Sequence, residues 1–416
     1  MLEYSSMKLS EELAARGFIY QHSADTSTIL DGEKRTVYLG IDPTADAIHV
    51  GNLVPFMMLN HIMKAGHKVI LLLGGGTAMI GDPSGRDTER ELATVEKISA
   101  QAAVMEAGVR ALSTGDITFV NNYDWLSKLT ALDFMRDVGK HFTVNAMIKK
   151  ESVAKRMESE NGISYTEFSY SLLQGYDYLH LHQHHGADVQ IGGSDQWGNL
   201  IAGVELIRRV TGHEAYALTM PLIVDKTTGI KFGKSMGNAV WLSRHKTTPY
   251  ELYQFWLNTS DESVIDYLKL FTFLSLEEIT TISTSHDADR SVRTAQRRLA
   301  DEVVRFVHGE KARLGAALAT DTLFGNTSLD TLTTDEQTLL KTEAPIKTIT
   351  NSPLVDFLVE IELASSKREA RQFISEGAIA LNETVLTDEN LILSEQLNDI
   401  AVLRRGKKNR IFVGKV

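Results

Sequence analysis

The sequence predicts that the N-terminal part of the chain folds as an α/β domain with a doubly wound parallel sheet. Short runs of β-branched and other apolar residues alternate with longer segments of helical spacing between residues 36 and 225. Several of the short runs are continuously apolar and bounded by Gly, Asp or Pro, which is typical of strands buried on both faces of a parallel sheet. Because such sheets bind ligands at the carboxyl ends of their strands, the residues that follow each strand are the first candidates for a site.

The elements of this domain alternate along the chain. Strands are expected at residues 36–41, 68–74, 117–121, 187–192 and 218–224. Helices are expected at residues 53–64, 89–107, 144–157, 167–184 and 196–210. This order predicts a Rossmann-like domain over residues 1–248.

The remainder of the chain has a different pattern. Helical spacing at residues 250–258, 263–271, 275–283 and 291–308 predicts a small helical domain over residues 249–324. Residues 325–350 are rich in Thr, Ser and Asp, which is typical of a linker. Residues 351–416 return to compact patterning, with two short amphipathic helices and a β-hairpin, and are expected to form a C-terminal α+β domain.

Composition limits the classes of function. At 416 residues the chain is longer than a single core usually supports, and 43% hydrophobic with 23% charged residues is typical of a soluble globular protein. The absence of cysteine excludes disulfides, thiol nucleophiles and cysteine-ligated zinc. The first residues are acidic, with neither an apolar signal core nor an Arg-rich transit pattern, so we expect the protein to stay in the cytoplasm.

The net charge of -11 argues against indiscriminate nucleic-acid binding, so any RNA contact must come from local basic patches. Two basic patches lie near the C-terminus and are the candidate RNA-binding residues, although acidic residues balance them: Lys367, Arg368 and Arg371, then Arg404, Arg405, Lys407 and Lys408.

A strand-to-helix turn carries the first candidate site. Asp42-Pro43-Thr44 leaves the first strand, and His49-Val50-Gly51-Asn52 opens the next helix. Free N–H groups at a helix start favour anions, and Gly51 has no side chain to keep a ligand away. His49 and Asn52 lie three apart on one helical face, where both could donate to phosphate or ribose oxygens. Taken alone, the segment is better explained as an ordinary helix start with polar capping residues.

A later loop, Lys231-Phe232-Gly233-Lys234-Ser235, places two lysines around a glycine. It lacks the spacing of a Walker loop, and a turn of this kind is by itself usually a solvated surface loop. Its functional interpretation is a flexible clamp whose ammonium groups neutralise the charge on a departing pyrophosphate. The occurrence of both segments in one chain favours a nucleoside triphosphate site over either ordinary interpretation.

These two segments resemble the signatures of the class I aminoacyl-tRNA synthetases. Further segments are similar to those of the bacterial-type tyrosyl-tRNA synthetases: the run from Tyr38 through Asp42-Pro43-Thr44-Ala45-Asp46, Ile80-Gly81-Asp82-Pro83-Ser84-Gly85, Thr166-Glu167-Phe168-Ser169-Tyr170, Leu173-Gln174-Gly175-Tyr176-Asp177, and Gln190 through Asn199. The segments Ser365 to Arg371 and Gly377-Ala378-Ile379 resemble an RNA-binding fold shared with a small-subunit ribosomal protein. The likeness therefore covers nearly the whole chain.

The resemblance implies roles residue by residue. Tyr38 and Asp177 would contact the phenol of a tyrosine substrate. Its ammonium end would be held by Asp82, Tyr170, Gln174 and Gln196. ATP would be bound by Gly40, Asp42, Thr44, His49, Gly51, Asn52, Gly193, Asp195, Lys231, Lys234 and Ser235, with His49, Asn52, Thr44 and the two lysines as the catalytic groups. Arg86 and Arg90 would meet pyrophosphate.

The resemblance also implies an activity and partners. It implies a tyrosine-tRNA ligase that forms tyrosyl-adenylate and pyrophosphate and then charges the 3′-terminal adenosine of its tRNA. ATP would enter with Mg²⁺, no tightly bound cofactor or protein metal site would be needed, and the protein would be a homodimer with an insertion around residues 120–160. Residues 139–147 would lie at that dimer contact, although a generic core helix explains them almost as well.

The residue spacing supports the substrate assignment without the resemblance. Tyr170, Gln174 and Asp177 are separated by four and three residues and therefore share one helical face, where a carboxylate can accept a substrate hydroxyl. A solvated polar face is the alternative. Phenylalanine would leave Tyr38 and Asp177 unpaired, at a cost of ~1–3 kcal/mol for a neutral buried group.

Several features leave alternatives open. His180, His182, His184 and His185 could suggest a metal, but a solvated helix is the simpler interpretation. Asn52 and Leu39 depart from the histidine and cysteine that many relatives carry there. A tryptophan-specific homologue, an RNA-binding protein without catalysis, and an adenylating enzyme that does not use tRNA are the alternative functions. Tyr38 and Asp177 argue against the tryptophan-specific homologue, because they suit a phenol hydroxyl better than an indole. The intact lysine loop argues against a protein without catalysis. The C-terminal module argues against an enzyme that does not use tRNA.

Overall fold

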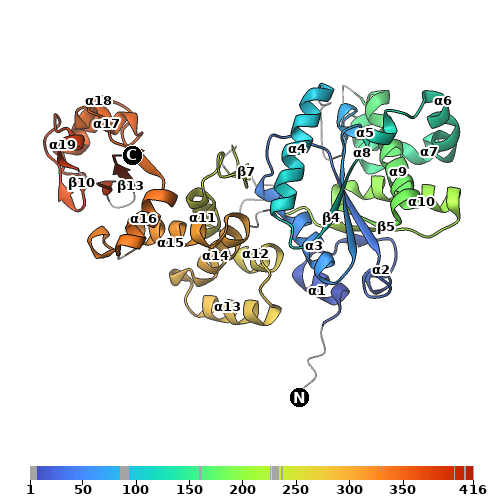
Figure 1. Cartoon of the computed structure of the whole chain (residues 1–416), viewed down its shortest axis with the longest axis horizontal. Coiled ribbons are helices and arrows are strands. Elements are labelled where there is room, and N and C mark those ends of the chain that lie inside the picture. The colour runs from blue at the N-terminus through green and yellow to red at the C-terminus, as the bar shows by residue number, and fades with distance from the viewer. Residues whose placement is uncertain are drawn as a thin grey trace, which may run out of the picture. The chain divides into compact units, whose positions relative to one another are not determined.

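The computed structural model describes residues 7–84, 93–158, 162–224, 226, 234–235, 238–325, 327–397, 399–406 and 409–415 (Figure 1). The chain forms two compact units. The first comprises Met1–Ser243 and Ser260–Ala295, and the second comprises Arg244–Thr259 and Gln296–Val416. Each unit is described by itself below.

The first unit is organised by a six-stranded sheet in the order β1-β6-β5-β2-β3-β4. Its strands are β1 (Gln21–His22), β2 (Thr36–Ile41), β3 (Lys68–Leu73), β4 (Ile117–Asn121), β5 (Ala187–Gly193) and β6 (Tyr216–Met220). All neighbours are parallel except β1, which pairs antiparallel with β6. The predicted doubly wound α/β class is confirmed, and the strand order reverses between β2 and β5, where such sheets bind ligands.

Helices cover both faces of this sheet. Helix α3 (Leu53–Lys64) packs on β3, whereas α9 (Tyr165–His185) and α10 (Trp197–Thr211) pack on β5. Figure 1 shows α4 (Val95–Ala111) on one side of the sheet and α9 and α10 on the other. The other helical segments of this unit are α1 (Leu9–Arg16), α2 (Thr26–Leu30), η1 (Val50–Asn52), η2 (Thr77–Met79), η5 (Ser194–Gln196), α12 (Val264–Phe271), α13 (Leu276–Ala288) and η6 (Arg290–Val292).

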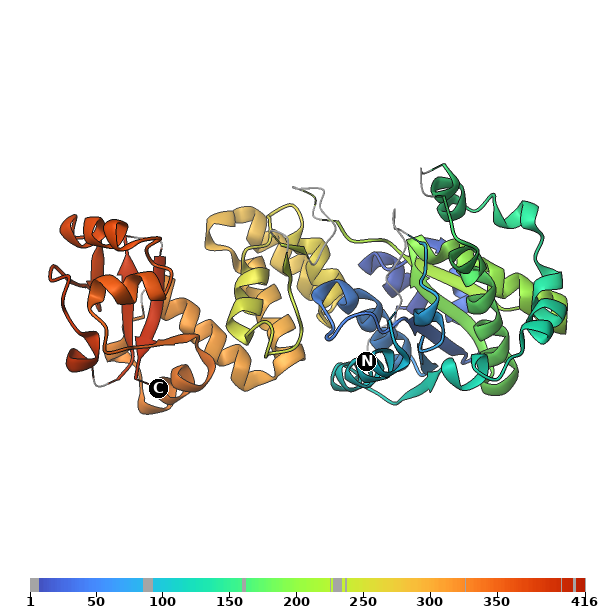
Figure 2. The same ribbon diagram turned by 90° about the horizontal axis from the view of Figure 1, so that it is seen from above.

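The segment between β4 and α9 is a chain of short helices, seen in teal along one edge of the unit in Figure 2. They are α5 (Tyr123–Leu126), α6 (Ala131–Asp133), η3 (Phe134–Val138), η4 (Gly139–His141), α7 (Val144–Met147) and α8 (Glu151–Met157). The single helix expected at 144–157 is interrupted, because Lys150 adopts an extended conformation (φ -65°, ψ 134°) immediately before α8.

Helix α9 is the element that carries most of the candidate substrate residues, and local chemistry sets its ends. At its start the Ser164 hydroxyl accepts the Glu167 N–H at 3.2 Å, which satisfies one free donor of the first turn. At its end Gly186 adopts φ 67°, a left-handed conformation that glycine tolerates best. The helix is held laterally by Glu167, whose carboxylate accepts two hydrogen bonds of 2.8 Å from the buried Arg156.

The second unit joins helices to a five-stranded sheet in the order β11-β10-β12-β13-β9. Its strands are β9 (Ile346–Thr348), β10 (Ile379–Leu381), β11 (Thr384–Val385), β12 (Ala401–Arg405) and β13 (Asn409–Gly414). Its helical segments are α11 (Pro249–Leu257), α14 (Thr294–His308), α15 (Glu310–Phe324), η7 (Leu329–Thr331), α16 (Thr334–Glu343), α17 (Leu354–Glu360), α18 (Lys367–Ser375) and α19 (Leu393–Gln396). The expected C-terminal α+β fold is present.

The compact units differ from the expected division of the chain. Helices α12 and α13, expected in one helical domain with their neighbours, belong to the first unit. Buried Arg16 explains this, because its guanidinium donates to the carbonyls of Lys269, Thr272 and Leu274 and so ties α12 to α1.

The expected linker at residues 325–350 contains helix α16 and strand β9. Its polar composition reflects helix capping rather than an unstructured connection, since Thr333 and Glu336 form a capping box at the start of α16. Within the described part of the chain, no helix is both long and apolar enough to cross a membrane.

Candidate active site

A cavity of about 260 Å³ lies at the carboxyl ends of β2 and β5. Several of the predicted site residues line it: Tyr38, Gly40, Asp42, Asn52, Asp82, Tyr170, Gln174, Asp177, Gly193 and Gln196. The sheet thus brings together residues that are far apart in the sequence, at the edge where the strand order reverses.

Asp177 is a buried carboxylate at one end of this cavity. Its Oδ1 accepts the indole N–H of Trp125 and its Oδ2 accepts the amide N–H of Asn122, each at 2.8 Å. Burial raises the pKa of Asp177 to about 7, and the two hydrogen bonds oppose that rise. The carboxylate is therefore oriented by two neutral donors and changes charge close to neutral pH.

Tyr38 lies on the central strand β2 with its side chain fully buried. Its ring packs edge to face against Tyr178 at a centroid distance of 4.9 Å. Its hydroxyl oxygen, together with Oε1 of Gln174 and Oε1 of Gln190, has no hydrogen-bond partner among the described residues. Because buried polar atoms are normally paired, three such atoms around one cavity indicate a polar ligand.

The network continues through Asp42 towards Tyr170. Asp42 accepts the hydroxyl of Thr77 at 2.8 Å and the phenol of Tyr170 at 3.0 Å. Burial, and the neighbouring Asp42 carboxylate, raise the pKa of Tyr170, so its hydroxyl stays protonated and donates. Gly74 is required beside this carboxylate, because a Cβ there would collide with Asp42 and Thr77.

A third carboxylate, that of Asp82, also lines the cavity. Its Oδ2 accepts the side-chain amide of Gln196 at 2.6 Å, and its Oδ1 accepts the Ser84 N–H at 2.9 Å. Among the described residues, the lining holds the carboxylates of Asp42, Asp82 and Asp177 and no lysine or arginine. This charge favours a ligand with an ammonium group.

The His49 turn adjoins the cavity through Asn52. His49 Nδ1 accepts the Gly51 N–H at 3.0 Å, and the backbone N–H of His49 donates to the Asn52 side chain at 3.3 Å. Because Nδ1 accepts, the proton of the neutral ring lies on Nε2. The Gly51 N–H therefore fixes the orientation of the imidazole at the start of η1.

The segment that follows the lysine loop is hydrogen-bonded to this histidine turn. The N–H of Val50 donates to the carbonyl of Val240, and the N–H of Leu242 donates to the carbonyl of Ile48, at 2.9 and 2.8 Å. His49 also meets Trp241 edge to face at 6.1 Å. Residues 240–242 are therefore held against the histidine turn through the backbone. Upstream of them, Lys234–Ser235 form strand β7, which pairs antiparallel with β8 (Asn238–Ala239).

Known protein families and individual proteins match nearly the whole chain. The family model described as "tRNA synthetases class I (W and Y)" matches residues 30–325, and that of the "Tyrosine--tRNA ligase SYY-like C-terminal domain" matches residues 337–413. The tyrosine-tRNA ligase of Streptococcus mutans is 46% identical over 415 residues, covering 97% of this chain and 98% of that protein. The chain belongs to the tyrosine-tRNA ligase family. The family predicted from the sequence is thereby confirmed.

A further relative and a solved structure support membership of the same family. The tyrosine-tRNA ligase of Levilactobacillus brevis is 45% identical over 422 residues, covering 99% of this chain and all of that protein (100%). A C-terminally truncated mitochondrial tyrosyl-tRNA synthetase of Aspergillus nidulans is 31% identical with a TM-score of 0.69, covering 76% of this chain and 94% of that structure. A tryptophanyl-tRNA synthetase of Encephalitozoon cuniculi, at 12% identity and a TM-score of 0.56, shares the fold alone.

Not every predicted residue of this ligase-family chain lines the cavity. Thr44, His49, Gly51 and Asp195 lie outside its lining. Asp195 still shapes the site, because a Cβ on Gly193 would come within 2.6 Å of its Oδ1. Lys231, Arg86, Arg90, Lys407 and Lys408 lie outside the described residues, as do the side chains of Lys234 and Ser235.

The C-terminal basic residues are largely paired within the domain. Lys367 contacts Asp356 at 2.6 Å, Arg371 contacts Glu389 at 2.8 Å and Arg404 contacts Glu383 at 3.4 Å. Arg405 donates to the Leu363 carbonyl. Arg368 lies exposed on α18. Of the described residues in these two patches, Lys367, Arg371, Arg404 and Arg405 therefore already have partners within the domain.

Sequence reasoning assigned no role in the cavity network to Thr77, Asn122, Trp125 or Gln190. Asn122 and Trp125 follow strand β4 directly, a position that parallel sheets use for ligands, and this was a usable signal. Gln190 is a polar residue within the buried run of strand β5, and its position in a predicted strand was another usable signal. Among the described residues, no group of three or more His, Cys, Asp or Glu is arranged to hold a metal ion.

Proposed function

We propose that this chain activates L-tyrosine with ATP and then transfers the tyrosyl group to the 3′-terminal adenosine of its tRNA. In the first step an oxygen of the tyrosine carboxylate attacks the α-phosphorus of ATP, the bond to the β-phosphate oxygen breaks, and pyrophosphate leaves. In the second step a ribose hydroxyl of the tRNA attacks the activated carbonyl and AMP leaves. Membership of the tyrosine-tRNA ligase family supports both steps.

The observation that carries the substrate assignment is the pairing of Tyr38 and Asp177 in one cavity. Tyr38 has a buried hydroxyl without a partner among the described residues, and Asp177 has a buried carboxylate with a fixed orientation. A substrate phenol would accept from the first and donate to the second. Phenylalanine would leave the Tyr38 hydroxyl unpaired, at a cost of ~1–3 kcal/mol for a neutral buried group, and would give Asp177 no donor beyond Asn122 and Trp125.

The other end of the cavity suits the ammonium group of an amino acid. Asp82 and Asp42 supply negative charge, while Gln174 Oε1 offers an unpaired acceptor. The hydroxyl of Tyr170 already donates a hydrogen bond to Asp42 and would keep that carboxylate in place. These groups would orient the substrate carboxylate towards the nucleotide, and positioning of this kind can supply most of the catalysis of such a step.

The nucleotide would lie along the His49 turn. The Nε2–H of His49 and the N–H groups at the start of α3 would face the phosphates, with Asn52 directed to phosphate or ribose. Lys231 and Lys234 would neutralise the pyrophosphate, and Arg86 and Arg90 are further candidates. Mg²⁺ would arrive with ATP and be held mainly by its phosphates.

A homodimer and a cytoplasmic location belong to the same proposal. Large apolar side chains are exposed on the short helices between β4 and α9 and at the start of α9: Leu132, Met135, Val144, Met157 and Tyr165. Such a surface suits burial against a second copy. The α+β domain at the C-terminus would bind the tRNA, through Arg368 and the neighbouring basic residues, in the compartment where tRNA is charged.

The decisive experiment is ATP–pyrophosphate exchange measured with each of the twenty amino acids. Exchange is expected with tyrosine and only weakly, if at all, with phenylalanine or tryptophan. Exchange led by tryptophan would reassign the substrate, and a lack of exchange with any amino acid, alongside intact tRNA binding, would support an RNA-binding protein without catalysis. Lys234→Ala should slow exchange strongly with little change in tyrosine affinity.

A further inference from the structure

We propose that His180 is a positioning residue for tyrosine recognition. It holds the indole of Trp125 in the orientation that donates to Asp177, and so acts on the substrate cavity from outside it. The inference rests on the proposed tyrosine-activating function.

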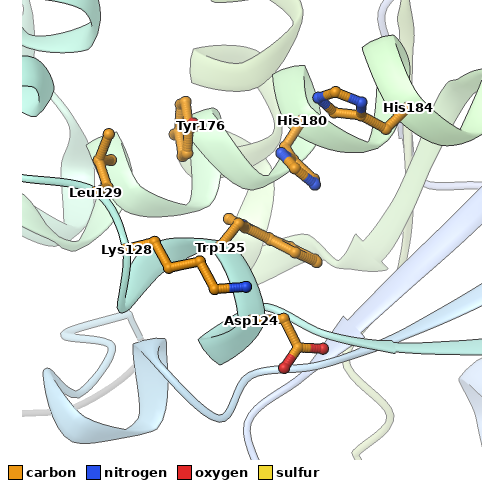
Figure 3. A pocket seen from close by; sticks show the side chains of 7 residues that line it. All are labelled: Asp124, Trp125, Lys128, Leu129, Tyr176, His180 and His184. Atoms are coloured by element: carbon orange, nitrogen blue, oxygen red, sulfur yellow. The ribbon is translucent and has the colours of Figure 1, made fainter.

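The geometry forms a continuous chain of contacts from the protein surface to the cavity. The rings of His180 and Trp125 are stacked, with centroids 4.2 Å apart and planes 17° from parallel. The same indole donates its N–H to Asp177 Oδ1 at 2.8 Å. Figure 3 shows the imidazole of His180 over the indole of Trp125. The stack and the hydrogen bond therefore constrain one ring from two directions.

Trp125 needs such support because of where it lies. It belongs to α5, a helix of only four residues, and its side chain is only partly buried. Beside it opens a pocket of about 460 Å³, lined by Asp124, Trp125, Lys128, Leu129, Tyr176, His180 and His184 (Figure 3). Without the imidazole the indole could turn towards this pocket and withdraw its N–H, because the χ2 rotation of an aromatic ring is broad.

The stacking does not require a charged imidazole. His184 lies on the far side of His180, with ring centroids 4.3 Å apart. Burial, and then the neighbouring His184 and His185, lower the pKa of His180 to about 4, so it is neutral at physiological pH. The other charged or titratable groups around this pocket are Asp124, Lys128 and Tyr176. A neutral aromatic ring of similar size should therefore replace His180.

The orientation of Trp125 affects substrate binding through the charge of Asp177. The indole hydrogen bond favours the ionised carboxylate and opposes the effect of burial on its pKa. Loss of that bond should raise the pH at which Asp177 ionises and weaken the hydrogen bond that Asp177 accepts from a substrate phenol. The other titratable groups near Asp177 are Asp42, Tyr38, Tyr170 and Tyr176. The pKa of each of these tyrosines lies above its usual value, so none titrates near pH 7.

The experiment is tyrosine-dependent pyrophosphate exchange measured between pH 6 and 9 on full-length variants. His180→Ala should raise KM for tyrosine about tenfold with little change in kcat, and should shift the midpoint of the kcat/KM profile to higher pH. His180→Phe should restore both quantities. His185→Ala, an exposed change on the same helix, should behave as the wild type.

A double-mutant cycle separates this role from general damage to the fold. Trp125→Phe keeps a ring for stacking but removes the N–H donor, so it should raise KM and shift the profile by itself. Adding His180→Ala to that variant should then change little. The inference is overturned if the two effects add, if His180→Phe is as impaired as His180→Ala, or if His180→Ala leaves KM and midpoint unchanged. Failure of the wild type to exchange tyrosine would refute the proposed function instead.

Discussion

The side-chain amide of Asn122 donates to Asp177 Oδ2 at 2.8 Å, deep within the first unit where neither side chain is solvent-exposed. The same nitrogen donates to Thr77 Oγ1 at 2.9 Å, and Thr77 in turn donates to Asp42. Asn122 also accepts the Gly76 N–H at 2.7 Å. One buried amide therefore links the carboxylate at the phenol end of the cavity to the carboxylate beside Tyr170.

Asn122→Ala should weaken tyrosine binding and destabilise the protein. Asp177 would lose one of its two donors, and a hydrogen bond to a charged group contributes ~1.5–3 kcal/mol, which corresponds to a dissociation constant at least tenfold higher. The Gly76 N–H would also lose its acceptor, so the melting temperature without ligand should fall. Equilibrium tyrosine binding and thermal unfolding measure the two effects. An unchanged affinity with a lower melting temperature would make Asn122 purely structural.

The pH dependence of tyrosine activation should follow Asp177. Its pKa of about 7 means that the carboxylate is ionised above neutrality and protonated below it. A protonated Asp177 no longer accepts the substrate hydroxyl as a carboxylate does, so kcat/KM for tyrosine should fall as the pH drops below 7. The fall should approach about tenfold per pH unit on the acid side.

Phenylalanine provides the internal control for this profile. It has no hydroxyl, so its kcat/KM should not follow the ionisation of Asp177, and the tyrosine-to-phenylalanine ratio should decrease at low pH. Pyrophosphate exchange with both amino acids between pH 5.5 and 9 tests this. A ratio that stays constant across the range would show that Asp177 is not the discriminating group.

The sequence was sufficient for the elements whose residues interact locally. The boundaries of β2, α3 and β4 match the predicted ranges 36–41, 53–64 and 117–121, because apolar runs and turn residues define them. The spacing of Tyr170, Gln174 and Asp177 predicts one helical face, since a face is fixed by period alone, and all three side chains line one cavity.

Contacts between distant segments could not be predicted in the same way. The pairing of Trp125 with both Asp177 and His180 depends on how α5 packs against α9. Glu167 was part of a recognised segment, but its buried ion pair with Arg156 requires the fold. The four histidines near the end of α9 were open to a metal interpretation, whereas the structure stacks His180 on an indole. Periodicity cannot distinguish these outcomes, because each depends on the partner rather than on spacing.

Tyr38→Phe should stabilise the ligand-free protein while impairing substrate binding. The hydroxyl of Tyr38 is fully buried and has no partner among the described residues, and an unpaired buried polar group costs ~1–3 kcal/mol. Its removal should raise the melting temperature without ligand. The additional stabilisation produced by saturating tyrosine should shrink, because the bound phenol loses a donor. A variant that melts earlier than the wild type without ligand would mean that the hydroxyl is satisfied in solution.

Trp241→Ala should slow adenylate formation without weakening tyrosine binding. Trp241 lies between Val240 and Leu242, the residues through which the lysine-loop segment is hydrogen-bonded to Val50 and Ile48. Its ring also meets His49 edge to face at 6.1 Å. Loss of the ring should increase the mobility of the His49 imidazole and of the segment that follows the lysine loop. Both the imidazole and the loop are proposed to act on the phosphates rather than on the amino acid. We expect a rate about tenfold lower, the effect of removing one electrostatic contact of modest strength.

Trp241→Phe, which keeps an aromatic edge, is the matched control and should retain most of the rate. Single-turnover activation and equilibrium tyrosine binding separate the two quantities, and a loss confined to tyrosine affinity would contradict the placement of the nucleotide along the His49 turn.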